Sequence, residues 1–239
     1  MKLTAYRTAL FKEKQELISF IVRYVPELNE GDILVVSSKL ICLWKGTCVN
    51  YVSRKQKEQL IVQESQCAVK TKLAWLTVKE GMVMTNAGID ESNANGKLLL
   101  LPKDLFEVAE EIRKKLMQAY QIKKLGVIIT DSMILPLRTG VIGAACAYAG
   151  FRGVRDEIGK KDLFGKMLSV TQINLADALA ASAALLMGER SEKKPLCRIE
   201  NAPVKFVSKT VKTEIVYPLE KDLYAPLFKA AGLTKRRTK

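Results

Sequence analysis

Two short apolar runs in this sequence each end in a small cluster of polar residues. Residues 33–36 read Ile-Leu-Val-Val and lead into Ser37-Ser38-Lys39, and residues 126–129 read Gly-Val-Ile-Ile and lead into Thr130-Asp131-Ser132. Continuous apolar runs of this length, rich in β-branched residues, are typical of strands buried on both faces. Because a strand ends at the edge of its sheet, the pattern predicts a sheet that presents hydroxyl, amine and carboxylate groups to a ligand.

Helical patterns alternate with these runs. Apolar side chains recur at helical spacing over residues 12–25, 105–120 and 174–187. Asp104 is placed to cap the second helix, and Gly188 ends the third. The third helix is rich in alanine, which predicts close packing against its neighbours.

The remaining segments alternate between polar and apolar character. The polar segment 53–70 is predicted to be helical, and the segments 73–78 and 81–84 have the composition of strands. No repeat or low-complexity linker separates these pieces. The sequence therefore predicts one intertwined unit of mixed α/β (α+β) class, and neither a P-loop nor a Rossmann fold, since both Gly-rich phosphate motifs are absent.

Composition narrows the chemistry. The 239 residues are 48% hydrophobic and 27% charged and include no histidine. This composition is that of a globular protein, and it excludes a Ser-His-Asp triad, a histidine base and a His-rich zinc site. The five cysteines form no C-x-x-C pair and suit a reducing cytoplasm, where we expect the protein to act. The longest stretch of low charge, residues 139–151, is too short to span a bilayer.

The charge is strongly basic and unevenly placed. Lys and Arg number 39 against 25 Asp and Glu, a formal net charge of +14. Residues 193–239 hold 12 of the basic and 4 of the acidic residues, so +8 of the +14 lies there, and the chain ends in Lys235-Arg236-Arg237-Thr238-Lys239. Short basic termini are commonly solvated. Nucleic-acid binding is the alternative function of a different class, although no helix-turn-helix or row of stacking aromatic residues accompanies the charge.

Two aspartates stand out as candidate metal ligands. Asp90 follows the apolar segment 81–84 and lies beside Ser92 and Asn93, and Asp131 lies between Thr130 and Ser132. Carboxylate and hydroxyl oxygens suit Mg²⁺ or Mn²⁺, which bridge nucleotide phosphates. A role as turn or cap residues remains open for both.

Other charged residues carry weaker signals. Arg138, followed by Gly140, is suited to holding a phosphate or a carboxylate, or is an ordinary surface arginine. Glu189 follows the helix-ending glycine and would supply a third carboxylate to a site with two metal ions. Asp156 and Asp162 are interpreted as cap or turn residues.

Several segments, taken together, resemble a known family. They are GDILVVSSK (31–39), NAGIDESN (86–93), LLLLPKDLFEVAEEIRKKL (98–116), GVIITDS (126–132), RTGVIG (138–143) and the segment 159–189, which ends in LLMGE. In order and spacing they are similar to the gamma-glutamyl ligase family typified by coenzyme F-420-0:L-glutamate ligase. The resemblance runs from about Ala5 to Val207, so the domain is expected over residues 1–207, with a basic extension over 208–239.

The resemblance implies an activity and a set of partners. Members phosphorylate the terminal carboxylate of an acceptor with GTP or ATP, and the amine of L-glutamate then displaces the phosphate. Trp44 with Gly46, the Ala-rich helix and the Asp162-Leu163-Phe164-Gly165 motif resemble more closely the branch assigned to folate metabolism. The leading hypothesis is therefore ligation of glutamate to a folate-type acceptor, with the deazaflavin precursor F-420-0 as the alternative. The resemblance also implies a homodimer.

The resemblance also implies roles for individual residues. It implies that Asp90 and Asp131 bind a divalent metal and that Ser132 and Glu189 complete a second metal position. Ser38, Lys39 and Asn93 would contact the nucleotide, and Arg138 would steady a carboxylate or a phosphate. Phosphoryl transfer needs alignment and charge neutralisation more than a base, so the lack of histidine is compatible with it.

The chain also departs from the deazaflavin members. Where many of them read S-K-A-E-G-R, it reads Cys42-Leu43-Trp44-Lys45-Gly46-Thr47, and Glu80 stands where a histidine is frequent. These differences fall on the expected nucleotide or acceptor side and leave the candidate metal carboxylates unchanged.

Overall fold

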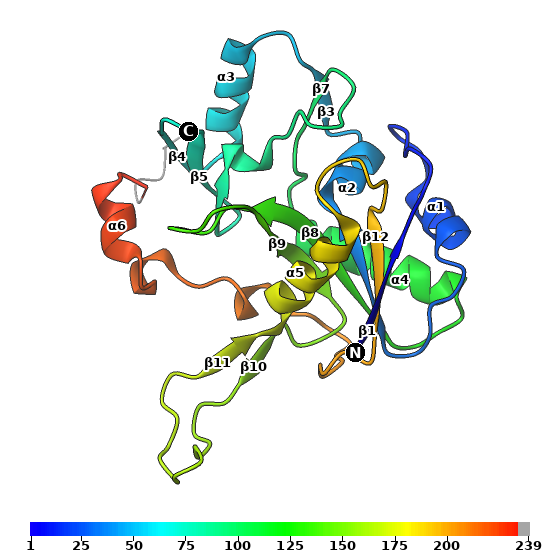
Figure 1. Cartoon of the computed structure of the whole chain (residues 1–239), viewed down its shortest axis with the longest axis vertical. Coiled ribbons are helices and arrows are strands. Elements are labelled where there is room, and N and C mark those ends of the chain that lie inside the picture. The colour runs from blue at the N-terminus through cyan, green and yellow to red at the C-terminus, as the bar shows by residue number, and fades with distance from the viewer. Residues whose placement is uncertain (234–239) are drawn as a thin grey trace.

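A computed structural model describes residues 1–233 of the chain. The basic terminus Lys235-Arg236-Arg237-Thr238-Lys239 lies outside the described residues. Several small sheets surround a central sheet in this structure (Figure 1). The expected mixed α/β class is confirmed.

The central sheet has five strands and is almost entirely antiparallel. The exception is the parallel pair of β2 and β8, the two apolar runs singled out in the sequence. Their residues Ile33–Val36 and Val127–Ile129 are fully buried, as predicted. The spatial order of the strands is β1 (Lys2–Tyr6), β12 (Leu196–Glu200), β2 (Asp32–Ser37), β8 (Leu125–Met133) and β9 (Ile142–Ala149).

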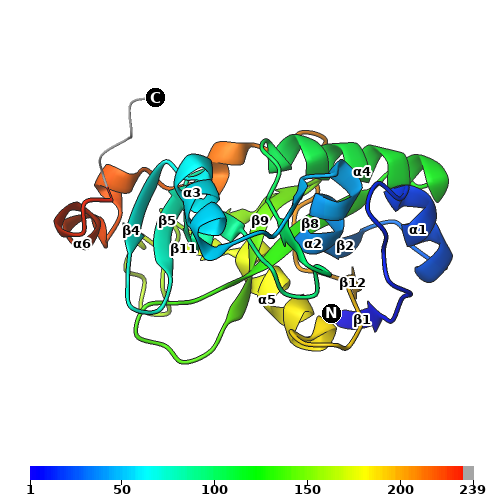
Figure 2. The same ribbon diagram turned by 90° about the horizontal axis from the view of Figure 1, so that it is seen from above.

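Helices cover both faces of this sheet (Figure 2). On one face, α1 (Leu17–Tyr24), α2 (Ser38–Lys45) and α4 (Leu105–Ala119) pack on Leu34, Val36 and Ile129. On the other face, α5 (Leu175–Met187) packs on Ile33, Val35 and Ile128. Alternate strand residues therefore enter two separate cores, which explains why both apolar runs are continuous.

The alanine-rich helix packs as closely as its composition predicts. A Cβ added at Gly143 of β9 would lie 2.3 Å from the Cβ of Ala184 on α5. No L side chain fits in that space, so the approach of α5 to the edge strand requires glycine.

Smaller elements extend from this core. The sheet β4–β5–β6 and the helix α3 form a second lobe, and the hairpin β10–β11 projects from the body (Figure 1). The bounds are β3 (Cys48–Asn50), α3 (Arg54–Glu64), β4 (Cys67–Lys70), β5 (Trp75–Lys79), β6 (Met82–Thr85), η1 (Asn86–Gly88), β7 (Lys97–Leu99), β10 (Val154–Asp156), β11 (Gln172–Asn174), η2 (Lys212–Glu214), η3 (Leu219–Lys221) and α6 (Ala225–Ala230).

Some sequence-based expectations were wrong in detail. The first helix starts at Leu17, five residues later than predicted, and the segment 53–70 is divided between α3 and the strand β4. Asp104 lies before α4 in the left-handed conformation, and its side chain makes no capping hydrogen bond to that helix.

The basic C-terminal segment also differs from the expectation of a solvated end. Its strand β12 lies inside the central sheet, between β1 and β2. Residues 208–214 continue along the core: Arg113 donates to the Ser208 carbonyl oxygen at 3.1 Å, and the Gly150 N–H donates to the Thr210 hydroxyl at 2.9 Å. At least this part of the predicted extension is packed rather than solvated.

Candidate active site

The parallel pair of strands brings the two polar clusters together. Ser37 pairs with Thr130, the last pair of residues in the β2–β8 ladder. From there β2 turns into α2, which begins at Ser38, while β8 continues through Asp131 and Ser132. The predicted edge of polar groups is therefore present, although the second cluster lies within its strand because β9 continues to pair with it.

Lys39 connects this edge to the segment that contains Asp90. Its Nζ pairs with the Asp90 carboxylate and donates to the Ser92 hydroxyl at 3.0 Å. Asp90 in turn accepts from the Ser92 backbone N–H at 2.7 Å and from the Ser92 hydroxyl at 2.9 Å. The turn therefore fixes the Asp90 carboxylate while the lysine neutralises it.

Asp131 and Glu189 also lie near Lys39, close enough to affect its pKa. Burial raises the pKa of the Asp131 carboxyl and Glu189 adds to that rise, whereas the Ser132 N–H, Lys39 and Ser38 oppose it. The Ser132 hydroxyl donates to Glu189 at 2.6 Å. Burial also lowers the pKa of Lys39, against the attraction of Asp131 and Glu189. The positive charge of Lys39 thus offsets the repulsion among three carboxylates, those of Asp90, Asp131 and Glu189.

Asn93 joins the two loops that carry these carboxylates. Its side-chain Nδ2 donates to the carbonyl oxygen of Arg190 at 3.0 Å, one residue beyond Glu189. Its φ of +55° lies in the left-handed region, which asparagine adopts more readily than most residues. In this structure Asn93 holds the loops together, a role that the sequence did not indicate.

Gly88 in the same loop is required by the local backbone conformation and by a close contact. Gly88 has a φ of +69°, and a Cβ there would lie 2.2 Å from the Leu101 side chain. Asn86, two residues before Gly88, accepts the Trp75 N–H at 3.1 Å through its side chain. The Asn-Ala-Gly sequence is thus explained by the close turn that delivers Asp90.

Arg138 is not joined to this group. It lies on the exposed loop between β8 and β9, and within residues 1–233 its side chain makes no hydrogen bond or ion pair. Asp156 and Asp162, in contrast, accept backbone N–H groups two residues further on, so their interpretation as turn residues is confirmed.

The positions where the chain departs from deazaflavin members are used for packing. Cys42 is buried, and Lys45 lies 4.0 Å from the centre of the Trp44 ring and pairs with Glu111 at 2.7 Å. Thr47 donates to the Leu100 carbonyl oxygen at 2.6 Å.

The donors at this edge suit a hard cation, although they are not gathered around one point. Asp90, Asp131, Glu189 and Ser132 offer only oxygen atoms, the ligands that Mg²⁺ and Mn²⁺ prefer. Within the described part of the chain, no three His, Cys, Asp or Glu residues lie close enough to hold a metal ion. Lys39, which pairs with Asp90 and is attracted by Asp131 and Glu189, supplies the positive charge near these carboxylates.

Two buried cysteines behind Asp131 were missed by sequence reasoning. Burial raises the pKa of Cys42 to about 12 and raises that of Cys146 as well, in both cases with a contribution from the Asp131 charge. Both thiols are buried and lie close enough to Asp131 to be affected by its charge. Nothing in their spacing indicates this, because they come from α2 and β9.

A sheet edge where a helix begins beside carboxylates, hydroxyls and a lysine is typical of enzymes that act on anionic, phosphate-bearing substrates. Comparison with known proteins gives the family. The chain matches the family described as F420-0:Gamma-glutamyl ligase over residues 6–201.

Relatives span most of the chain. Proteins named coenzyme F420:L-glutamate ligase are 36% identical over 230 residues in Methanococcus maripaludis strain C6, covering 89% of this chain and 91% of the relative. The relative of the same name in Methanocaldococcus jannaschii is 32% identical over 234 residues, which cover 90% of this chain and 93% of the relative. The relative in Archaeoglobus fulgidus is 38% identical over 199 residues, which cover 75% of this chain and 78% of the relative. The chain therefore belongs to the F420-0:gamma-glutamyl ligase family, and the predicted enzyme class, a ligase, is confirmed.

The relatives' names bear on the acceptor. They refer to coenzyme F420 and not to folate, so they support the alternative acceptor better than the leading one. Across residues 1–233, none of the helices is long and apolar enough to cross a membrane.

Proposed function

We propose that this protein joins L-glutamate through an amide bond to a coenzyme F420-type acceptor, in a reaction that consumes GTP or ATP and requires Mg²⁺ or Mn²⁺. The observation that carries the proposal is the meeting of Lys39, Asp90, Asp131 and Glu189 at one edge of the sheet. It occurs in a chain whose relatives are named as ligases of this kind.

The start of α2 is suited to the nucleotide phosphates. Its N-cap Ser37 makes no side-chain hydrogen bond to the first turn. The backbone N–H groups there are left for an anion, and the helix dipole favours negative charge at this end. Lys39 in that turn supplies a full positive charge, so Ser38 and Lys39 together would hold a phosphate.

The carboxylates are suited to the metal. When bound, the ion would neutralise charge on the transferred phosphoryl group and align it. Asp131, Ser132 and Glu189 would supply oxygens on one side, and Asp90 would supply one after Lys39 turns toward phosphate. Burial raises the pKa of Asp131, and a cation bound beside it would favour the charged form of the carboxylate.

The chemistry then proceeds by two displacements. An oxygen of the acceptor's carboxylate attacks the terminal phosphorus, the bond to the bridging oxygen breaks, and the nucleoside diphosphate leaves. The glutamate amine attacks the carbonyl carbon of the acyl phosphate, the C–O bond breaks, and inorganic phosphate leaves as the nitrogen loses a proton. The first step moves negative charge from the carboxylate to the nucleoside diphosphate; the second leaves it on the released phosphate while the amine proton passes to solvent, and neither requires a histidine.

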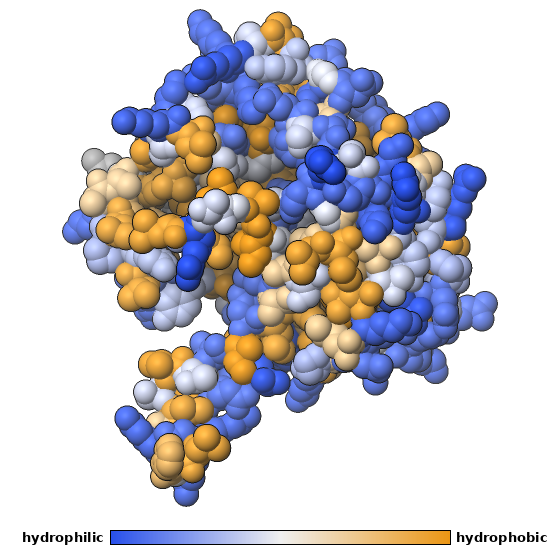
Figure 3. All heavy atoms as spheres, viewed as in Figure 1, coloured by the Kyte–Doolittle hydropathy of each residue, from blue (hydrophilic) through white to orange (hydrophobic). Residues whose placement is uncertain are grey.

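The proposal includes a homodimer that forms through the projecting hairpin. Its loop exposes several large apolar side chains, with Leu163 and Phe164 almost fully accessible (Figure 3). Burying such side chains is worth roughly 1.5–3 kcal/mol each. A second copy of the chain is the occupant that the family resemblance suggests, and Arg138 on its exposed loop is then available to a partner's substrate.

The acceptor is tested by product analysis. The purified protein is incubated with L-glutamate, Mg²⁺, and GTP or ATP, together with either the F420-type precursor or reduced folates. Mass spectrometry should detect the precursor increased by one or more glutamyl units, with folates unchanged. A glutamylated folate and an unchanged deazaflavin would overturn the proposed acceptor and restore the folate hypothesis.

A further inference from the structure

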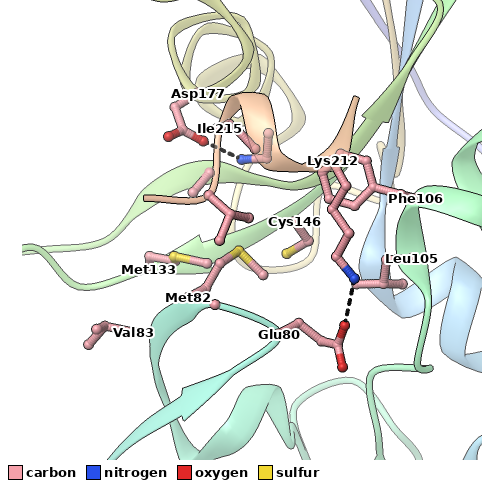
Figure 4. Close-up of a pocket in the computed structure, with 14 residues that line it drawn as sticks. Glu80, Met82, Val83, Leu105, Phe106, Met133, Cys146, Asp177, Lys212 and Ile215 are labelled. Atoms are coloured by element: carbon pink, nitrogen blue, oxygen red, sulfur yellow. Dashed lines mark hydrogen bonds and ion pairs between the residues drawn. The ribbon is translucent and has the colours of Figure 1, made fainter. Parts of the chain in front are cut away.

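A cavity lies on the same side of the central sheet as Asp131, at its β9 edge. It has a volume of about 180 Å³ and is bounded by the turn between β5 and β6, the start of α4, the strands β8 and β9, and the C-terminal segment (Figure 4). Sites for whole drug-sized ligands usually measure about 300–1,000 Å³. The cavity is therefore suited to one end of a ligand rather than to a whole acceptor.

The cavity adjoins the candidate active site directly. Met133 lines it and lies two residues beyond Asp131 on β8, so both side chains point to the same face of the strand. Ala144, which pairs with Asp131 across the ladder, also lines the cavity. Cys146 completes the shared wall. A ligand that extends out of the cavity along β8 reaches the carboxylates.

The walls are apolar and rich in sulfur. Met82 and Met133 line one side of the space, and Phe106 and Leu105 border it from α4 (Figure 4). Ile215 and Val216 of the C-terminal segment form the remaining side. Thioether sulfur and aromatic side chains make favourable contacts with the faces and edges of flat rings.

The charged groups at the rim argue against an anionic occupant. Among the residues that the structure describes, Lys212 is the one cation that lines the cavity, and it pairs with Glu80 at 3.0 Å. Asp177 adds a second carboxylate, which already accepts from the Ala145 N–H at 2.8 Å and from Asn174 at 2.6 Å. A phosphate or the two carboxylates of L-glutamate would meet no unpaired positive charge among these described lining residues.

We infer that this cavity binds the flat deazaflavin ring of the acceptor, which rests on the function proposed above. The ring lies between Met82, Met133 and Phe106, and its polar edge faces the Glu80–Lys212 pair. The rest of the acceptor runs along β8 and carries its carboxylate to the edge at Asp131. The C-terminal segment, which follows the residues matched by the family, thus gains a role as one wall of the acceptor site.

The test uses the ring without the reacting end. A 5-deazaflavin that carries only a ribityl chain has no phosphate or carboxylate, and its own fluorescence reports binding. The full-length protein is titrated against it, together with the cavity variants Met82→Glu and Val83→Glu. Val52→Glu is the matched control, because Val52 is a largely exposed valine that does not line the cavity.

Each outcome decides the inference. Support is a Kd at least tenfold higher for Met82→Glu and at least threefold higher for Val83→Glu, with Val52→Glu unchanged. Val83 is partly exposed, so its variant tests the site even if Met82→Glu does not fold. Equal binding by the wild type and Val83→Glu would place the ring elsewhere and overturn the inference while leaving the proposed function intact.

Two further outcomes separate the inference from the proposed function. If the wild type binds neither the ring nor the complete F420-type precursor, the proposed function fails and the inference fails with it. If a pterin, used in the same titration, binds in a manner that Val83→Glu weakens while the deazaflavin does not bind, the occupant is a folate-type ring and the deazaflavin assignment is wrong.

Discussion

The strand-end site and the β10–β11 hairpin differ in which side chains they expose to solvent. At the site, charged side chains are partly buried: in their ion pair, the Lys39 and Asp90 side chains are 30% and 37% exposed. On the hairpin, apolar side chains are turned outward, and Leu163 and Phe164 are 97% and 96% exposed. Neither arrangement benefits an isolated folded chain.

The contrast separates two kinds of requirement. Bringing three carboxylates near one lysine costs stability, which is expected where a cation and a phosphate are to be bound. Exposing apolar side chains on a projecting hairpin leaves free energy to be gained by covering them. In the proposed function, substrates complete the site and a second copy of the chain covers the hairpin.

The largest expected effect concerns the carboxylates. Asp90→Asn and Asp131→Asn keep the size of the side chain and remove its charge, so each should lower the ligation rate at least 100-fold with the fold preserved. Asp156→Asn is the matched control, because that side chain accepts a backbone N–H in an exposed turn and asparagine does the same. Product formation followed by mass spectrometry measures the effect, and near-normal turnover by either variant would return that aspartate to a turn role.

The hairpin provides the next largest effect. Replacing both Leu163 and Phe164 with lysine should weaken self-association at least tenfold, because two exposed apolar side chains become charged. Light scattering coupled to size-exclusion chromatography gives the mass of the particle. Leu10→Lys, an exposed leucine outside the hairpin, serves as the control. An unchanged dimer in the double variant would show that the hairpin does not form the contact.

A smaller effect is expected in stability. Burial raises the pKa of Asp131 above its unfolded value, so the stability provided by its protonated form is present at low pH and is lost as the pH rises through the folded pKa. Asparagine does not titrate. Without divalent cations, Asp131→Asn should therefore melt at a higher temperature than the wild type at pH 7, with a smaller difference at pH 4.

Thermal unfolding at the two pH values in the presence of a chelator measures whether Asp131→Asn melts above or below the wild type. Each kcal/mol gained in the free energy of unfolding raises the melting temperature by about 2–4 °C in a chain of this size. A variant that is less stable than the wild type at pH 7 would mean that Asp131 contributes through its charge to the folded state and is not strained there.

Much of the fold was predictable because its signals are local. The apolar runs at 33–36 and 126–129 and the helices α4 and α5 were predicted from residues adjacent in sequence. The strand β12 was not, since its charged residue Arg198 lies buried in the sheet. It is neutralised there by Asp32 at 2.7 Å, a partner 166 residues away in the sequence.

The site was predictable to a similar extent. The sequence indicated a polar cluster after each of the apolar runs 33–36 and 126–129, and the structure brings the two clusters together because β2 and β8 are parallel neighbours. The pairing of Lys39 with Asp90 and of Ser132 with Glu189 depends on how two loops fold over the sheet edge, for which no periodicity exists. The role of Asn93 as a link between those loops has the same cause, because its acceptor is 97 residues away.

The path of one oxygen atom tests the central claim most directly. The acceptor is prepared with oxygen-18 in the carboxylate that receives glutamate and is converted by the wild-type protein with Mg²⁺, nucleotide and L-glutamate. If the strand-end site activates that carboxylate by phosphorylation, one labelled oxygen appears in the inorganic phosphate for each amide bond formed. Amide product accompanied by unlabelled phosphate would contradict an acyl phosphate and, with it, the proposed role of Lys39, Asp90, Asp131 and Glu189 in activating the acceptor.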